Sequence, residues 1–349
     1  MKAAVLRGGA MVVDEVADPV PAEGQVLVRT IACGICGSDL HFAKHGRRMV
    51  EVMGEAAGGE VSPLAGSLDF DRDIVMGHEF SAEVIDHGPN TQGAAIGTTV
   101  VSLPILMEGW TMADMRAIGY SNTYPGGYGE FMVLSAPLLL EVPNGLDPRH
   151  AALTEPMAVG LHAVNRSRIQ PGESALVLGC GPVGLAVIAA LRLKGIAVIV
   201  ASDFSPARRA LAATMGATQV VDPAVTPAII AWREAAGTTT PVLYEAVGVQ
   251  GMLGGAMRDA PRGARILVVG VCMEDDTIIP MHGINKELEI QFVLGYGPDE
   301  FGDTLRSIAE GEVDVAPLIT GSVDIDGVAG AFDALANPDA HAKILVEPT

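Results

Sequence analysis

The chain has 349 residues, of which 49% are apolar and 18% charged, so it is long enough for two cores and is neither disordered nor of low complexity. Its 42 acidic and 22 basic residues give a net charge of -20, which excludes nucleic acids and anionic membrane surfaces as partners. No apolar stretch reaches the roughly 20 residues of a membrane-spanning helix, and the first residues show no signal-peptide pattern, so we expect a cytoplasmic protein. Four cysteines in a chain of this length do not make a disulfide framework, and they favour metal binding or burial.

Roughly the first 150 residues are rich in Gly and Pro and carry short runs of alternating apolar residues. Alternation of this kind is typical of half-buried strands. The runs lie at residues 25–31, 81–85 and 129–134. They predict an irregular, mostly antiparallel β domain at the start of the chain.

From residue 155 onward, helical and strand patterns alternate. An unbroken apolar run at 175–178 predicts a buried parallel strand. Further strands are expected at 196–201, 219–221, 242–247, 265–271 and 288–294, and helices at 155–167, 183–193, 206–215, 250–259 and 298–310. This βαβ rhythm predicts an α/β fold with a doubly wound parallel sheet.

The last residues carry one more strand pattern, at 342–346, which could rejoin the first domain. We therefore expect a discontinuous catalytic domain of residues 1–156 and 295–349. A dinucleotide-binding domain of residues 157–294 would lie between these two parts.

A glycine-rich loop follows the strand at 175–178 and opens a helix. In a G-x-G-x-x-G sequence the first glycine permits a tight turn, the second lets the backbone approach a pyrophosphate, and the third allows close helix packing. Asp203 ends the next strand, where a carboxylate accepts the ribose hydroxyls of NAD and repels the 2′-phosphate of NADP. The residues assigned to cofactor binding are Gly179, Gly181, Pro182, Val183, Gly184, Asp203 and Arg208.

NAD is thus the predicted cofactor, with two alternatives. Arg208 or Arg209 could reach a 2′-phosphate, which would favour NADP, although both arginines are expected on a solvated helix face. The glycines could also form a turn without binding any nucleotide.

Side chains that can bind a metal gather at three places in the first domain. A thiolate, an imidazole and a carboxylate are the ligand set of a catalytic zinc that keeps one position open, although each such residue alone is more often structural. Cys33 and Cys36 form a C-x-x-C pair, but no second pair or thioredoxin-like βαβ unit accompanies it, so we expect Cys33 to be a buried strand residue. The three places hold Cys36, Ser38, Asp39 and His41, then His78 and Glu79, and then Glu155.

Four motifs follow one another along the chain: GICGSDLH at 34–41, GHE at 77–79, TEP at 154–156 and GCGPVG at 179–184. In this order they resemble the zinc-dependent medium-chain dehydrogenase family, which includes alcohol, butanediol, polyol and threonine dehydrogenases. The resemblance covers essentially the whole chain. It implies a GroES-like catalytic domain, a Rossmann domain, and an NAD-dependent alcohol dehydrogenase that converts a neutral secondary alcohol or diol to the ketone or aldehyde.

By motif position, the resemblance implies that Cys36 and His78 bind the zinc. Glu155 occupies the position of the third ligand, while Glu79 in some members ligates directly or exchanges with water, so the choice between the two glutamates stays open. Asp39 matches the carboxylate that orients the metal-bound imidazole.

The resemblance also implies a path for the substrate proton. Ser38 matches the hydroxyl that accepts this proton, and His41 matches the imidazole that passes it to solvent through the cofactor ribose. The ordinary pKa of histidine, near 6.5, suits such a shuttle. The candidate catalytic residues are therefore Ser38, His41 and Glu79.

Two features depart from many members of the family. Residues 101–126 contain no cysteine, whereas many members hold a structural zinc there with four, so we expect one catalytic zinc per subunit and no structural zinc. This Met-rich stretch should be held by packing or press against another subunit. Cys36 and His78 lie 42 positions apart, and the charged segment 42–76 between them predicts a solvated surface excursion or, as the alternative, a lid.

Two competing hypotheses use the same fold. The first is a zinc-free NADPH-dependent enone or quinone reductase, against which the zinc ligand set and Asp203 both argue. The second is a catalytically silent binding protein, which is disfavoured because only chemistry requires Ser38, Asp39 and His41 together. No basic cluster near the motifs suggests an anionic substrate, so the expected partner is a small neutral alcohol. The resemblance also places the strands at 265–271 and 288–294 at a dimer axis, which predicts a homodimer or homotetramer.

Overall fold

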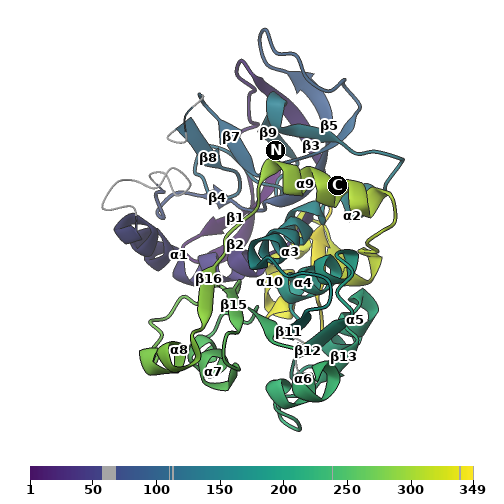
Figure 1. Ribbon diagram of the computed structural model, residues 1–349. Coiled ribbons are helices and arrows are strands. Elements are labelled where there is room, and N and C mark those ends of the chain that lie inside the picture. Colours follow the sequence, from purple (N-terminus) through teal and green to yellow (C-terminus); the bar gives the residue numbers. More distant parts are fainter. Residues whose placement is uncertain (57–67, 110, 112–113, 238, 338, 349) are drawn as a thin grey trace.

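The chain combines a β-rich region with a parallel α/β region. The computed structural model describes residues 1–56, 68–109, 111, 114–237, 239–337 and 339–348. Figure 1 shows the β-rich region in the upper part of the view and the parallel strands with their helices below it. Within the described residues, no helix has both the length and the apolar character needed to cross a bilayer.

The β-rich region is built mainly from antiparallel strands. It contains β1 (Lys2–Arg7), β2 (Ala10–Glu15), β3 (Gln25–Gly34), β4 (Ile74–Val75), β5 (Glu79–His87), β6 (Thr99–Ser102), β7 (Ile105–Met107), β8 (Met115–Ala117), β9 (Phe131–Ser135), β10 (Leu139–Glu141), β17 (Ile319–Val323) and β18 (Lys343–Val346). Its main sheet has the order β10-β6-β5-β3-β18-β17, with β9 also paired to β3. The strands predicted at 25–31 and 81–85 are confirmed as parts of β3 and β5, and the strand predicted at 129–134 overlaps β9, which begins two residues later.

The end of the chain returns to this sheet. β18 runs antiparallel to β3, with Leu345 opposite Gly34 and Val346 opposite Cys33. The expectation that residues 342–346 rejoin the first region is therefore confirmed. This pairing brings the C-terminal strand beside the strand that leads into the first sequence motif.

The α/β region has one parallel sheet covered by helices. Its strands are β11 (Ser174–Leu178), β12 (Val198–Ser202), β13 (Gln219–Val221), β14 (Pro241–Glu245), β15 (Arg265–Val268) and β16 (Glu289–Phe292), in the order β13-β12-β11-β14-β15-β16. All described pairs in this sheet are parallel. This order is that of a doubly wound dinucleotide-binding sheet, as the sequence predicts.

Helices connect these strands and join the two regions. They are α2 (Pro148–Ala151), α3 (Thr154–Ser167), α4 (Pro182–Leu193), α5 (Pro206–Met215), α6 (Ala228–Ala236), α7 (Met252–Asp259), α8 (Pro280–Lys286), α9 (Pro298–Ala309) and α10 (Val328–Leu335), with short 3-10 turns at Ala136–Leu138, Ala316–Leu318 and Ile325–Gly327. One buried cluster contains Ala32 and Leu345 of the β-rich sheet together with Val177 of β11. The domain division at 156/157 and 294/295 stays a prediction, and α3 crosses the first of these boundaries.

The segment 42–76, predicted to be a surface excursion or a lid, begins with most of a helix that the sequence does not predict. α1 (Gly37–Ala56) has buried Phe42 and Gly46 one turn apart, and a Cβ at Gly46 would lie 2.7 Å from the ring of Phe70. Glycine at 46 and 54 weakens the helical pattern in the sequence, which explains the difference. Residues 57–67 of the predicted excursion, and residues 110 and 112–113 of the Met-rich stretch, lie outside the described residues.

Candidate metal centre and cofactor cleft

A cleft of about 1370 Å³ is lined by both regions of the chain. From the β-rich side and the start of α3 it is lined by Cys36, Ser38, His41, His78, Glu79 and Glu155. From the α/β side it is lined by Gly179, Gly181, Pro182, Val183, Asp203 and Arg208. Asp39 and Gly184 are buried outside this lining. The residues predicted for metal, proton and cofactor chemistry therefore share one cleft or its supporting core.

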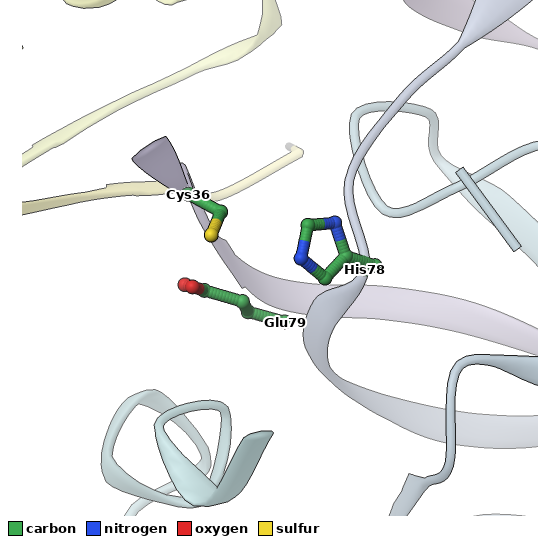
Figure 2. Close-up of side chains that lie close together, drawn as sticks. All are labelled: Cys36, His78 and Glu79. Atoms are coloured by element: carbon green, nitrogen blue, oxygen red, sulfur yellow. The ribbon is translucent and has the colours of Figure 1, made fainter. Parts of the chain in front are cut away.

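Strand pairing brings the first two motifs together. Gly34 of β3 lies opposite Glu79 of β5, so the residues that follow β3 meet those that begin β5. The Cys36 sulfur, a His78 ring nitrogen and a Glu79 carboxylate oxygen all lie within 4.8 Å of one another (Figure 2). A Cβ at residue 34 would lie 2.0 Å from a carboxylate oxygen of Glu79, so a larger residue than glycine there would displace this carboxylate.

This group of three fits a zinc ion by its chemistry. Sulfur, imidazole nitrogen and carboxylate oxygen are the donors that zinc prefers. Burial is the main cause of a raised pKa for the Cys36 thiol, with the Glu79 charge adding to it and His78 opposing it. His78 Nδ1 is buried without a hydrogen-bond partner, at 3.4 Å from Asp39 Oδ1. A cation at this position would compensate the thiolate and the carboxylate together.

Glu155 faces the same cleft but lies outside the group of three. Tyr296 donates a hydrogen bond of 2.9 Å from its phenol to Glu155 Oε1. Burial raises the pKa of Glu155 to about 7, the nearby His78 lowers it, and the negative charge of Glu79 raises it further. These electrostatic effects show that Glu155 lies near the group without joining it.

Lys343 is a partner of Glu79 that the motifs do not reveal. Its Nζ lies 2.7 Å from Oε1 and 2.6 Å from Oε2 of Glu79, and it also donates to the Ile35 carbonyl at 3.0 Å. Burial lowers the pKa of Lys343, but the charges of Glu79 and Cys36 outweigh it, so the pKa is raised overall. The signal in the sequence is one lysine within an otherwise apolar strand, β18.

Asp39 is a buried carboxylate next to the proposed metal ligands, and it accepts several hydrogen bonds. It accepts hydrogen bonds from the Cys36 amide at 3.0 Å, from Tyr120 Oη at 2.8 Å and from Tyr128 Oη at 2.6 Å. Burial raises its pKa, but His78, Tyr128 and the Cys36 amide outweigh that effect and the pKa is lowered overall. Neither tyrosine is in the predicted site, and no local pattern distinguishes them from ordinary core aromatics.

Ser38 and His41 lie in the first turns of α1. Ser38 Oγ is 3.0 Å from Tyr120 Oη. His41 is exposed at the cleft, and its partial desolvation together with the charge of His45 lowers its pKa below the ordinary value of 6.5. Both side chains reach the cleft, so the structure places the predicted proton acceptor and shuttle on one helix.

The glycine-rich loop has the backbone that a phosphate-binding turn needs. Gly179 has a φ of 92°, and a Cβ at Gly184 would lie 2.0 Å from the Gly179 carbonyl oxygen. Gly181 caps the N-terminus of α4, where free amides favour anions. The loop therefore approaches its helix as closely as the motif predicts.

The residues after β12 distinguish the two neighbouring arginines. Asp203 accepts hydrogen bonds from the amides of Cys180 and Ser205, each at 2.8 Å. Arg209 pairs with Asp222 at 3.2 Å, whereas Arg208 lines the cleft with a buried Nε that has no hydrogen-bond partner. Of the two, Arg208 is thus the arginine available to a cofactor phosphate.

Known proteins show the same combination of domains. Residues 22–144 match the model of the alcohol dehydrogenase GroES-like domain, and residues 182–310 match that of the zinc-binding dehydrogenase. The (R,R)-butanediol dehydrogenase of Bacillus subtilis is 32% identical over 344 residues, which covers 96% of each protein. The chain belongs to the zinc-dependent medium-chain dehydrogenase family.

Solved structures of medium-chain dehydrogenases share this fold over the full length. A crystal structure of 2R,3R-butanediol dehydrogenase from Bacillus subtilis has a TM-score of 0.83 and 30% identity, covering 100% of this chain and 99% of that one. A Sinorhizobium meliloti protein described as a zinc-binding dehydrogenase, bound to NADP, has a TM-score of 0.82 and 27% identity, with 99% of each chain covered. As a medium-chain dehydrogenase, the chain is an oxidoreductase that acts on the CH-OH group of an alcohol. The predicted family, α/β fold and GroES-like region are confirmed.

Proposed function

We propose that this medium-chain dehydrogenase uses one zinc ion and NAD to oxidise a neutral secondary alcohol or diol to the ketone. The observation that carries the proposal is the group of Cys36, His78 and Glu79 in the same cleft as the glycine-rich loop. The relatedness to a butanediol dehydrogenase supports a secondary alcohol or diol as substrate.

Cys36 and His78 would hold the zinc, with a glutamate as the third ligand. Glu79 has its carboxylate within reach of the other two donors but shares both oxygens with Lys343, whereas Glu155 has one oxygen held by a phenol. When bound, zinc supplies Lewis acidity that lowers the pKa of an alcohol in the cleft. The absence of cysteine from residues 101–126 supports one zinc per chain.

Ser38 and His41 would carry the proton away from the alcohol. Ser38 Oγ takes the proton, and His41, one turn further along α1, passes it to solvent. The lowered pKa of His41 keeps its imidazole neutral and able to accept a proton near neutral pH.

Asp203 and the loop would select and orient the cofactor. The carboxylate of Asp203 suits the two ribose hydroxyls of NAD, and the amides at the N-terminus of α4 suit the pyrophosphate. NAD supplies the hydride acceptor. Arg208 is the feature that would favour NADP, and the NADP-bound relative makes this cofactor the alternative to test.

The charge of the cleft supports a neutral substrate. Arg48 is the basic side chain of α1 that lines the cleft, and it pairs with Glu51 at 3.6 Å and with Asp275 at 3.8 Å. The same helix also contributes the apolar side chains of Met49, Val52 and Met53 to the lining. A compensated arginine beside apolar side chains suits an uncharged alcohol better than a carboxylate or phosphate.

A substrate panel tests the proposal directly. The purified protein is assayed for NADH formation with secondary alcohols, vicinal diols, polyols and primary alcohols, before and after removal of zinc with a chelator. We expect turnover of neutral secondary alcohols or diols that is lost with the zinc and restored by adding it back. Reduction of an enone with NADPH that survives chelation would instead support the zinc-free reductase, and a zinc-loaded protein with no turnover would support the silent binding protein.

A further inference from the structure

The phenol of Tyr120 connects two residues with different proposed roles. Its Oη lies 2.8 Å from Asp39 Oδ1 and 3.0 Å from Ser38 Oγ. Its ring packs between Phe42 and His78, with centroid distances of 4.8 and 5.3 Å. Tyr120 therefore contacts the hydroxyl proposed to accept the substrate proton as well as the carboxylate that supports His78.

Counting donors gives the direction of these two hydrogen bonds. A phenol has one proton to donate, and an ionised carboxylate can only accept. Asp39 also accepts hydrogen bonds from the Cys36 amide and from Tyr128, so its oxygens act as acceptors toward all three neighbours and the Tyr120 proton points to Asp39. The bond between Tyr120 and Ser38 must then be donated by Ser38.

This direction leaves the lone pairs of Ser38 free. A serine hydroxyl has one proton and two acceptor sites. Because the Ser38 hydroxyl donates its proton to a hydrogen bond with Tyr120 Oη, Ser38 can offer only acceptor sites to the cleft that it lines. An alcohol entering the cleft has a hydroxyl proton to donate, which is the complementary role.

We propose that Tyr120 is a positioning residue that holds Ser38 as a hydrogen-bond acceptor for the substrate alcohol. This inference rests on the proposed function. In the reaction the alcohol O-H bond breaks as a new Ser38 O-H bond forms, and the original Ser38 O-H bond turns from Tyr120 and breaks as an N-H bond forms on His41. Tyr120 neither gains nor loses a proton overall.

Tyr128 provides a matched control. It is completely buried and donates from the same kind of phenol to the other oxygen of Asp39, at 2.6 Å. Its hydrogen bond is to Asp39 and not to Ser38. Tyr120→Phe and Tyr128→Phe each remove one donor from Asp39 and keep the ring, but only Tyr120→Phe also releases Ser38.

The kinetic test compares these two variants and adds Ser38→Ala. Both tyrosine variants should retain zinc. Any loss of turnover caused by removing a hydrogen bond to Asp39 should appear in both variants. We expect kcat for Tyr120→Phe to fall roughly tenfold or more below that of Tyr128→Phe, because a misdirected acceptor lowers the fraction of productive complexes. In the Ser38→Ala background, adding Tyr120→Phe should change kcat by less than about threefold. When one residue acts through another, the effects of the two substitutions on kcat are not additive.

A binding measurement tests the same point without turnover. Trifluoroethanol, an alcohol that resists oxidation, is titrated into the zinc protein with NAD, and dimethyl sulfoxide is titrated with NADH. The alcohol needs an acceptor at Ser38, whereas the sulfoxide has no proton to donate. Tyr120→Phe should weaken trifluoroethanol binding roughly tenfold and leave sulfoxide binding unchanged.

The outcomes separate this inference from the proposed function. Equal losses in the two tyrosine variants, or a full additional loss in the Ser38→Ala background, would mean that Tyr120 acts through Asp39 alone and would overturn the inference. A wild-type protein that oxidises no alcohol would overturn the proposed function and this inference together, and it would be seen before any variant is compared.

Discussion

Lys343 and Glu79 form a buried ion pair in which Nζ lies within 2.7 Å of both carboxylate oxygens. Both side chains are almost completely inaccessible to solvent, and the remaining donor of the lysine is used by the Ile35 carbonyl. The pair joins the last strand of the chain to the strand that carries the second motif. The C-terminal strand thus contributes directly to the electrostatics of the metal group.

Replacing Lys343 with methionine should strongly destabilise the fold. The substitution leaves the Glu79 carboxylate buried without its counter-charge, and breaking one side of a buried pair in this way costs about 3 to 5 kcal/mol. The urea midpoint of the metal-free protein, followed by fluorescence, measures the effect. Lys343→Arg keeps the charge and should lose less, and Glu79→Gln added to Lys343→Met should recover part of the loss. An unchanged midpoint for Lys343→Met would contradict the importance of the pair.

Glu155 should make the stability of the metal-free protein fall as the pH rises from about 4.5 to about 7. Burial raises its pKa from the ordinary 4.5 to about 7, so between these values the folded protein binds a proton that the unfolded chain has released. The folded state therefore loses stability with rising pH, by an amount on the order of 3 kcal/mol. Urea midpoints at pH 5 and pH 8 measure this change.

Glu155→Gln is the control for this pH dependence. Glutamine does not titrate but keeps an acceptor for Tyr296, so the difference between the variant and the wild type isolates the glutamate from every other titrating group. We expect the variant to lose less stability over this pH range. The same pH dependence in both proteins would show that Glu155 titrates normally.

The sequence predicts the cofactor loop well because its contacts are local. The residues from Gly179 to Asp203 belong to one βαβ unit, so strand, turn and helix patterns alone bring Asp203 to the Cys180 amide. The members of the metal group are further apart along the chain, but each of them belongs to a motif that the sequence shows directly. These parts of the site depend on patterns that can be read directly in the chain.

The supporting residues are the part that the sequence does not reveal. Lys343 is 264 positions from Glu79, and Tyr120 and Tyr128 are 81 and 89 positions from Asp39. Lys343 becomes a neighbour of Glu79 through the pairing of β18 with β3. The tyrosines reach Asp39 through loops whose course cannot be predicted from periodic sequence patterns. A single buried lysine or phenol has no pattern of its own, so its partner is visible only in the folded chain.

Cys36→Ser should remove the zinc. We expect elemental analysis to give close to one zinc per wild-type chain and below about 0.1 for the variant, because a hydroxyl is a far weaker zinc ligand than a thiolate. NAD binding, measured by fluorescence, should be little changed. A value near two zinc ions per wild-type chain would contradict the single site.

Cys33→Ala is the matched control for this experiment. Cys33 is also buried but packs against Gly77 and Gly127 and lies outside the group of donors, so its removal should leave the zinc in place. Glu79→Gln and Glu155→Gln belong in the same series. The larger loss of zinc identifies the third ligand.

Asp203→Asn should weaken the preference for NAD. Asparagine keeps an acceptor for one of the two loop amides that Asp203 binds, and it removes the negative charge that repels a 2′-phosphate. We expect the ratio of kcat/KM for NAD to that for NADP to fall about tenfold, equivalent to about 1.4 kcal/mol. Arg208→Ala should lower kcat/KM for NADP more than for NAD, since Arg208, unlike Arg209, lines the cleft. A wild-type protein that prefers NADP would contradict the assignment to NAD.

The edge of the parallel sheet should pair with a second copy of the chain. In the described residues β16 is hydrogen-bonded on one side only, by β15, and Phe292 and Leu294 at this edge are 69% and 77% exposed. Ile284 of the adjacent α8 is 71% exposed, so apolar surface continues beyond the strand. Pairing two such edges would continue the sheet across a twofold axis and bury this surface.

Leu294→Glu should therefore shift the protein from an oligomer to a monomer. Burying a carboxylate in each of two symmetry-related copies is unfavourable, and the sedimentation-equilibrium mass should fall to the chain mass of 36.1 kDa. Val20→Glu is the matched control, because Val20 is 83% exposed but lies in the β-rich region, far along the chain from this edge. It should leave the mass unchanged. If the wild-type protein is itself a monomer at micromolar concentration, or if Leu294→Glu keeps the wild-type mass, the sheet edge is not the interface.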